Sequence, residues 1–196
     1  PLRDHELIHN YVLMGLTHEQ QNEIENEYWL PIEEATGEQI GAFWRHYLVM
    51  LTGREVDASG GRAVYDAFRH EFPRLGVEAL RGHAAQWREY AEIYGLLLDP
   101  AHTPDPEIGQ QFAYLGTFGR GVAPLLLRLY GDHVHGLLDR DELILSLEQV
   151  QSLLLRRAIV GISTDRLVAR LCRAAERGRD DLVHAIARIT PSDERT

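Results

Sequence analysis

The sequence predicts an all-α protein, built as an irregular multi-helix bundle of about eight to ten helices. Three observations support this fold class. Apolar residues recur at the spacing of a helical face along nearly the whole chain, the alternation typical of strands is nearly absent, and no repeat of fixed period is present. A chain of 196 residues can bury a core of its own, as one helical domain or two small ones.

In the first half of the chain, capping residues, glycines and prolines divide the apolar pattern into successive helices. Thr17 has the side chain of an N-cap, Gln20 stands in the reciprocal capping-box position, and Pro31 should kink its helix or mark a junction. The expected helices run from about Asp4 to Met14, from Thr17 to about Leu30, from Thr36 to Gly53, across Val64 to Phe68, and from Val77 to about Leu97.

In the second half, a segment with three prolines, Asp99 to Pro106, predicts a linker. We therefore expect an N-terminal helical subdomain over residues 1–98, a Pro-rich linker over 99–106, a C-terminal helical subdomain over 107–190 packed on the first, and a frayed tail over 191–196. The expected C-terminal helices are short ones around Ile108 to Leu115 and Val122 to Tyr130, a long one from Arg140 to Val160, one from Ser163 to Ala175 with a serine cap, and an amphipathic one around Asp181 to Ile189.

The charge distribution limits where an anion could bind. A formal net charge of −10 argues against a general binder of nucleic acid or membrane surfaces, so any anion site must be local. Up to Thr36, eight Asp and Glu residues accompany the single Arg3, whereas ten acids and ten arginines follow from Asp139 onward. The C-terminal third is therefore the region in which we expect an anion to dock.

The remaining composition predicts a cytoplasmic protein that does not enter the membrane. All 20 basic side chains are arginine, which is typical of codon bias in a GC-rich genome. The single Cys172 excludes an intramolecular disulfide and a multi-cysteine metal site, and it fits a reducing compartment as an inert thiol. No run of about eighteen apolar residues and no signal peptide is recognisable.

One catalytic motif is present in the sequence, and its context argues against it. His5, Glu6 and His9 match the HExxH pattern of zinc peptidases, in which two histidines bind zinc and the glutamate activates water. The third histidine of the extended motif is missing, no sheet precedes the helix, and ten histidines make a chance match easy. We therefore predict no metal, no cofactor and no catalytic residue in this chain, with an HExxH zinc hydrolase as a remote alternative.

Arginines of the C-terminal third form the candidate binding site. Arg157 falls on the apolar stripe of the long helix, so its guanidinium needs a partner, either inside the domain or outside the chain. A row of arginines spaced by four, three and four residues would lie on one helical face and could touch two or three successive phosphates. The candidate DNA-binding residues are Arg156, Arg157, Arg166, Arg170, Arg173 and Arg177, with Arg179 nearby.

Two alternatives to a DNA contact remain open for this row. The row could be a solvated face, partly neutralised by Asp165, Glu176, Asp180 and Asp181. It could also seat a neighbouring acidic protein surface, which would make the chain a pure protein–protein interaction module.

Two groups of residues resemble a known family. The first group is Asp4, Leu7, Ile8, Asn10, Tyr11, Leu13, Met14, Gly15 and Leu16, followed by the run from Tyr28 to Glu33. The second group is Leu51 to Gly53, Tyr65, Phe68, the run from Arg156 to Ile159, Gly161, Thr164 and Leu167. Together they are similar to the helical region that follows the ParB-like nucleotidase core in GmrSD-type, modification-dependent restriction proteins.

The resemblance implies a role within a larger protein. The chain would be the helical scaffold that couples nucleotide and modification sensing to DNA cleavage in an anti-phage restriction system. The nucleotidase and HNH-type nuclease domains of the same polypeptide would be its partners, and the NTP and the divalent metal would belong to them. The catalytic motifs of the nucleotidase and nuclease domains are both missing from this sequence, so no catalytic residue is carried over. The oligomeric state is left open.

Overall fold

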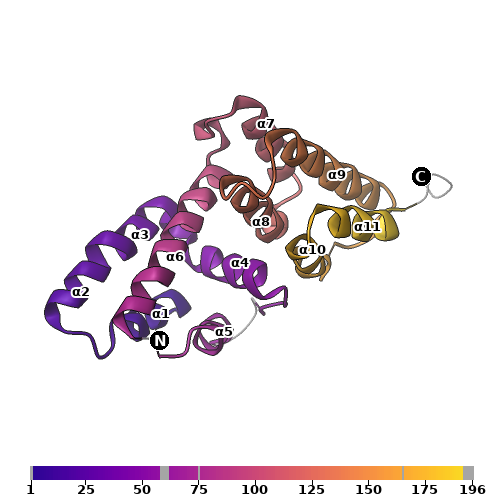
Figure 1. The fold of residues 1–196 in the computed structure, drawn as a ribbon. Coiled ribbons are helices and arrows are strands. Elements are labelled where there is room, and N and C mark those ends of the chain that lie inside the picture. The colour runs from indigo at the N-terminus through magenta and orange to yellow at the C-terminus, as the bar shows by residue number, and fades with distance from the viewer. Residues whose placement is uncertain (1, 58–61, 75, 165, 192–196) are drawn as a thin grey trace. The chain divides into compact units, whose positions relative to one another are not determined.

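The computed structural model describes residues 2–57, 62–74, 76–164 and 166–191. All regular elements in these ranges are helical, so the all-α prediction is confirmed (Figure 1). The α-helices are α1 (Asp4–Leu13), α2 (His18–Ile24), α3 (Leu30–Thr36), α4 (Ile40–Thr52), α5 (Ala63–Glu71), α6 (Val77–Leu98), α7 (Pro106–Gly116), α8 (Ala123–Val134), α9 (Arg140–Ile159), α10 (Leu167–Glu176) and α11 (Arg179–Ile189). The shorter elements are a π-helix, η1 (Glu25–Trp29), and three 3₁₀ turns, η2 (Gly37–Gln39), η3 (Pro100–His102) and η4 (Arg120–Val122).

Internal contacts divide the chain into two compact units. The N-terminal unit comprises Pro1–Leu48 and Val56–Leu98, and the C-terminal unit comprises Val49–Glu55 and Asp99–Thr196. Helix α4 contributes to both, because its residues up to Leu48 belong to the first and those from Val49 to the second. Among the described residues, no helix is both long and apolar enough to cross a membrane.

The N-terminal unit has an aromatic core. Helix α3 runs alongside α6 (Figure 1), and the ring of Trp44 on α4 is fully buried. Its centroid lies 5.7 Å from that of Trp29, 5.3 Å from that of Phe68 and 5.6 Å from that of Trp87. Stacked and edge-on rings at these distances bury much apolar area and add favourable quadrupole interactions.

At Pro31, where a kink or a junction is expected, a π segment, η1, leads directly into α3. Proline has no N–H, so the carbonyl of Glu27, four residues earlier, loses its helical donor. Arg88 on α6 donates from Nη1 to this carbonyl at 3.1 Å. The backbone N–H of Leu30 bonds to the carbonyl of Glu25 in the wider π pattern, which lets the helix continue through the proline.

The C-terminal unit has an aliphatic core in which α10 packs against α8 and α11. The region expected as a linker contains η3 and a buried Thr103, and the side chain of Asp105 accepts hydrogen bonds from the first backbone N–H groups of α7. Residues 192–196 of the expected tail lie outside the described residues.

The predicted serine cap of α10 is wrong. The helix begins at Leu167, and its N-cap is Arg166, whose φ of 61° is left-handed. The carbonyl of Ser163 instead accepts a hydrogen bond from Arg157, which holds this residue in the loop before the helix. The capping box of Thr17 and Gln20, in contrast, is present as expected.

Candidate nucleic-acid interface

Helix α10 separates apolar and basic residues on opposite faces. Its buried face consists of Leu167, Ala169, Leu171, Cys172, Ala174 and Ala175. The side chains of Arg166, Arg170, Arg173 and Arg177 are all exposed, as the four-three-four spacing predicts. Only Arg170 and Arg173 lie within the helix itself, because Arg166 and Arg177 are its two cap residues. We call these four residues the arginine face.

Two members of the arginine face have no acidic partner in the described part of the chain. Arg166 and Arg170 take part in no ion pair or side-chain hydrogen bond there, and both are exposed. Asp165, which was expected to neutralise part of the row, lies outside the described residues. These two guanidinium groups therefore have donors free for an anion.

The other two members are bound within the C-terminal unit. Arg173 donates from Nη1 to the carbonyl of Gly53 at 2.8 Å, and its stem packs directly on that glycine. Arg177 donates from Nε to Asp181 one turn further on, at 2.6 Å. At the C-terminal end of the arginine face, Asp181 therefore neutralises the charge of Arg177. Glu176 and Asp180 make no ion pair with the arginine face among the described residues.

Arg157 finds its partners inside the domain. Nη1 donates to the carbonyl of Ile189 at the end of α11, at 3.1 Å, and Nη2 donates to the carbonyl of Ser163. Carbonyls at a helix C-terminus lack helical donors and carry partial negative charge, so a guanidinium is a favourable partner for them. Arg157 therefore connects α9 to the end of α11 by a hydrogen bond. The adjacent Arg156 is half-buried.

A cavity adjoins the C-terminal end of the arginine face. It has a volume of about 280 Å³ and is lined by Arg128, Asp132, Arg177 and Arg179, among others. The Nε groups of Arg128 and Arg179 are buried without a hydrogen-bond partner in the described residues, and Arg128 Nη1 lies 3.9 Å from the Asp132 carboxylate. Burial raises the pKa of Asp132 above its ordinary value, and the charge of Arg128 offsets this only in part. The cavity thus extends the row of guanidinium donors beyond Arg177.

Arg128 is not among the residues that the sequence predicts for this site. It stands in α8 between Leu127 and Leu129, both buried, and its side chain is only 16% exposed. The sequence contained a signal that could have identified Arg128, because it is a lone arginine in a strongly apolar helix. The same kind of signal identified Arg157.

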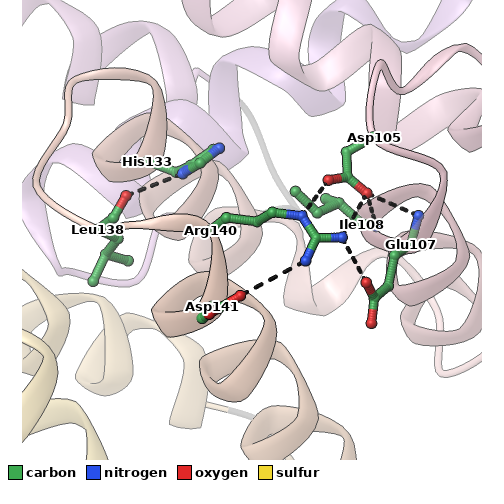
Figure 2. A network of polar contacts seen from close by, with 7 residues as sticks. All are labelled: Asp105, Glu107, Ile108, His133, Leu138, Arg140 and Asp141. Atoms are coloured by element: carbon green, nitrogen blue, oxygen red, sulfur yellow. Dashed lines mark hydrogen bonds and ion pairs between the residues drawn. The ribbon is translucent and has the colours of Figure 1, made fainter.

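A second polar network joins the starts of two helices in the C-terminal unit. Figure 2 shows the guanidinium of Arg140, at the start of α9, directed at the carboxylates of Asp105 and Glu107. Its Nε lies 2.6 Å from Asp105 Oδ2 and its Nη2 lies 2.6 Å from Glu107 Oε2. The bidentate contact with Asp105 joins the N-termini of α7 and α9. The same view shows His133, whose Nδ1 lies 3.0 Å from the carbonyl oxygen of Leu138.

The geometry of the HExxH segment argues against a zinc hydrolase. Glu6 accepts a hydrogen bond from the backbone N–H of Arg3 at 2.6 Å, so the group that would activate water caps α1 instead. His9 Nε2 lies 2.6 Å from Glu25, and its ring stacks on Trp29 at 4.5 Å. Within the described residues, no group of three His, Cys, Asp or Glu side chains could hold a metal ion.

No protein-family model, curated protein sequence or solved structure matches this chain. The basis for a function is therefore the geometry of the arginine face, together with the residues that carry the family resemblance.

Proposed function

We propose that this chain is a helical coupling domain of a bacterial, DNA-modification-dependent restriction protein, and that its arginine face contacts the DNA backbone. The observation that carries the proposal is the pair Arg166 and Arg170, exposed on one helix without an acidic partner in the described residues. Guanidinium groups form charge-assisted, often bidentate hydrogen bonds with phosphate oxygens. Contacts of this kind position a protein on DNA without reading its sequence.

The charge distribution indicates a local contact. The N-terminal unit holds 15 acids and 7 arginines, a formal charge of −8, whereas the C-terminal unit holds 15 acids and 13 arginines, a formal charge of −2. Long-range attraction by the whole chain is therefore unfavourable. Binding would depend on the few arginines that approach the phosphates directly, and we expect it to be weak and salt-sensitive in the isolated chain.

The coupling role is supported by the contact between Arg173 and Gly53. Gly53 directly follows α4 and lies in the segment Val49–Glu55, the part of the C-terminal unit that begins within α4. Arg173 thus belongs both to the arginine face and to the packing around this segment. A phosphate that competes for its guanidinium would change the contact with Gly53, which links DNA binding to the chain segment that follows α4.

Salt-dependent DNA binding tests the proposal. In fluorescence anisotropy with a duplex, the double variant R166A/R170A should bind less tightly, and the slope of log K against log salt should fall by about 1.8, or about 0.9 for each phosphate that is no longer neutralised. R120A is the matched control, because Arg120 is exposed on η4 of the same unit, outside the arginine face. An unchanged slope in the double variant would exclude the DNA contact.

A protein–protein interaction module is the second candidate, and exposed apolar residues favour it. At the end of α9, beside Arg156, the side chains of Leu155, Ile159 and Ile162 are 44%, 62% and 41% exposed. Clustered apolar exposure beside charge is typical of interaction surfaces. Under this candidate the arginine face seats a neighbouring domain of the same polypeptide. R166A/R170A would then weaken binding to the separately added nucleotidase or nuclease domain and leave DNA binding at the level of R120A.

A further inference from the structure

The N-terminal unit contains a cavity with basic and aromatic walls, formed by α1, α5 and the turn that follows α5. Its volume is about 700 Å³, within the range of about 300–1,000 Å³ common for small-molecule sites. The residues that line it include Tyr11, Met14, Tyr65, Asp66, Arg69 and Arg74. Every one of these residues belongs to the N-terminal unit, so this cavity is separate from the arginine face.

Positive charge is concentrated in this cavity although the unit as a whole is acidic. Arg69 and Arg74 make no ion pair among the described residues, and Asp66 is the acid that lines the cavity beside them. His70 adds a further nitrogen donor at the rim. With two arginines and one acid among its lining residues, the cavity has an excess of positive charge, which suits an anionic ligand.

Two tyrosine rings hold Arg69 in place. The Arg69 guanidinium lies 5.7 Å from the ring centroid of Tyr11 and 5.5 Å from that of Tyr65, close enough for cation–π attraction to both. Tyr11 is itself fixed, because its hydroxyl donates to the carbonyl of Phe72 at 2.9 Å. The positive charge therefore lies against flat apolar surfaces, which a planar ring of a ligand can cover.

A smaller chamber shares a wall with this cavity, and Trp87 is among the residues that line it. Its volume is about 40 Å³, enough for a small substituent or an ordered water. Tyr11, Met14, Pro73 and Arg74 line both spaces. Trp87, which also lines the chamber, is 1% exposed, and its indole Nε1 has no hydrogen-bond partner among the described residues. A buried N–H without an acceptor costs free energy, which a ligand acceptor would recover.

We infer that this cavity binds a small organic anion in which a planar ring carries a phosphate or a carboxylate. The anionic group binds Arg69 and Arg74, and the ring packs between Tyr65, Met14 and Pro73. An acceptor on the ligand or a bridging water meets the indole N–H of Trp87. A ring without charge cannot pair with the arginines, and an inorganic anion cannot pack against the apolar side chains. The ligand therefore needs both a planar ring and an anionic group.

Nuclear magnetic resonance titration of the full chain with phenyl phosphate tests this site. The indole signal of Trp87 is identified by its disappearance in W87F, and phenyl phosphate should shift it at concentrations where phenol and inorganic phosphate do not. Benzoate, tested in parallel, shows whether a carboxylate replaces the phosphate. In R69A the dissociation constant should rise by about tenfold or more, as expected when a charge-assisted bidentate interaction is removed.

The control for this titration is R3A, because Arg3 is an exposed arginine of the same unit outside the cavity. It should leave the dissociation constant unchanged. If R69A unfolds because it loses the contacts with Tyr11 and Tyr65, R74A provides the same test, since Arg74 stacks on neither tyrosine. Binding of inorganic phosphate as tight as that of phenyl phosphate, an unmoved Trp87 signal, or equal affinities in R74A and R3A would each overturn the inference. DNA binding by the C-terminal unit is unaffected by any of these outcomes.

Discussion

The two units form their cores from different residues. The N-terminal unit holds 12 of the 16 aromatic residues of the chain, including all three tryptophans, and its rings pack on Trp44. The C-terminal unit packs leucine, valine and alanine faces of α8 to α11, and it holds the single cysteine. Large rings cover much area with few residues, whereas aliphatic helices need long, closely matched faces.

Arginines of both units bind carboxylates and backbone carbonyls, as Arg140 and Arg88 show, but in the C-terminal unit these contacts also involve the arginine face. In the N-terminal unit Arg81 binds the carboxylates of Glu23 and Glu78, as expected for a surface with many acids. In the C-terminal unit Arg157 and Arg173 donate to backbone carbonyls and so hold loops and helix ends. Because Arg173 and Arg177 are bound within the unit, Arg166 and Arg170 are the members of the arginine face that remain available for a ligand.

The largest expected effect concerns the buried thiol of the C-terminal unit. Burial raises the pKa of Cys172 to about 12, against 9.0 for an ordinary thiol, so the thiolate fraction at mildly alkaline pH falls by about a thousandfold. Alkylation by iodoacetamide should be slower by at least that factor in the native chain than in concentrated urea. Since all tryptophans lie in the other unit, fluorescence and thiol labelling along a urea series report the two units separately. A native rate within about tenfold of the unfolded rate would contradict the burial of Cys172.

The second prediction removes the centre of the aromatic core. W44A should lower the free energy of unfolding by about 4 kcal/mol, because it leaves a large cavity among the rings of Trp29, Phe68 and Trp87. Near-ultraviolet circular dichroism of the tryptophans should weaken with it. The matched change in the aliphatic core, L147A, should cost about 3 kcal/mol and leave that signal intact, since Leu147 is fully buried in the unit without tryptophan. A decrease below about 1 kcal/mol for W44A would show that the rings repack.

The third prediction concerns the close approach of Arg173 to Gly53. Gly53 has a φ of +60°, and a Cβ there would lie 2.1 Å from Arg173 Cγ. G53A should therefore cost the strain of a left-handed alanine, about 1–2 kcal/mol, and about 2 kcal/mol more for the collision. G136A is the control for strain alone, because Gly136 has a φ of +74° with no atom within 4 Å of its Cβ position. In an R173A background the two glycine variants should become equal in urea unfolding, and a persistent difference would refute the contact.

The smallest expected effects concern one arginine–carboxylate ion pair within each unit. Hydrogen bonds from Arg81 and from Arg140 lower the pKa of Glu23 and of Asp105, respectively. A lowered folded-state pKa contributes stability above the unfolded pKa, and this contribution is lost as the pH falls through the folded-state pKa. Carboxyl titrations by nuclear magnetic resonance should show the pKa of Glu23 return to its ordinary range in R81M. In R140M the pKa of Asp105 should rise less completely, because backbone N–H groups of α7 still bind that carboxylate. Complete recovery at Asp105 would contradict the capping role.

The sequence predicted most helices because capping, helical periodicity and breakers are local properties. The capping box of Thr17 and Gln20 follows from spacing alone, as does the exposure of Arg170 and Arg173 within α10. The start of α10 was missed because Ser163 is a favourable cap in isolation, whereas its carbonyl is held by Arg157 from another helix. At Pro31, where the sequence predicts a kink or a junction, η1 gives way to α3, and Arg88, far away in sequence, binds the carbonyl that the proline leaves free.

The sequence by itself determined the all-α class, the contrast in charge between the two halves and the positions of the arginines along α10. Only the tertiary structure decided which arginines remain available, because their partners are backbone carbonyls and acids brought near by folding rather than by spacing. It alone also brought Tyr11, Arg69 and Trp87, from three different helices, to the walls of adjoining cavities. Hydrogen-bond partners and cavities depend on contacts between distant segments, and a local pattern of residue types does not specify those contacts.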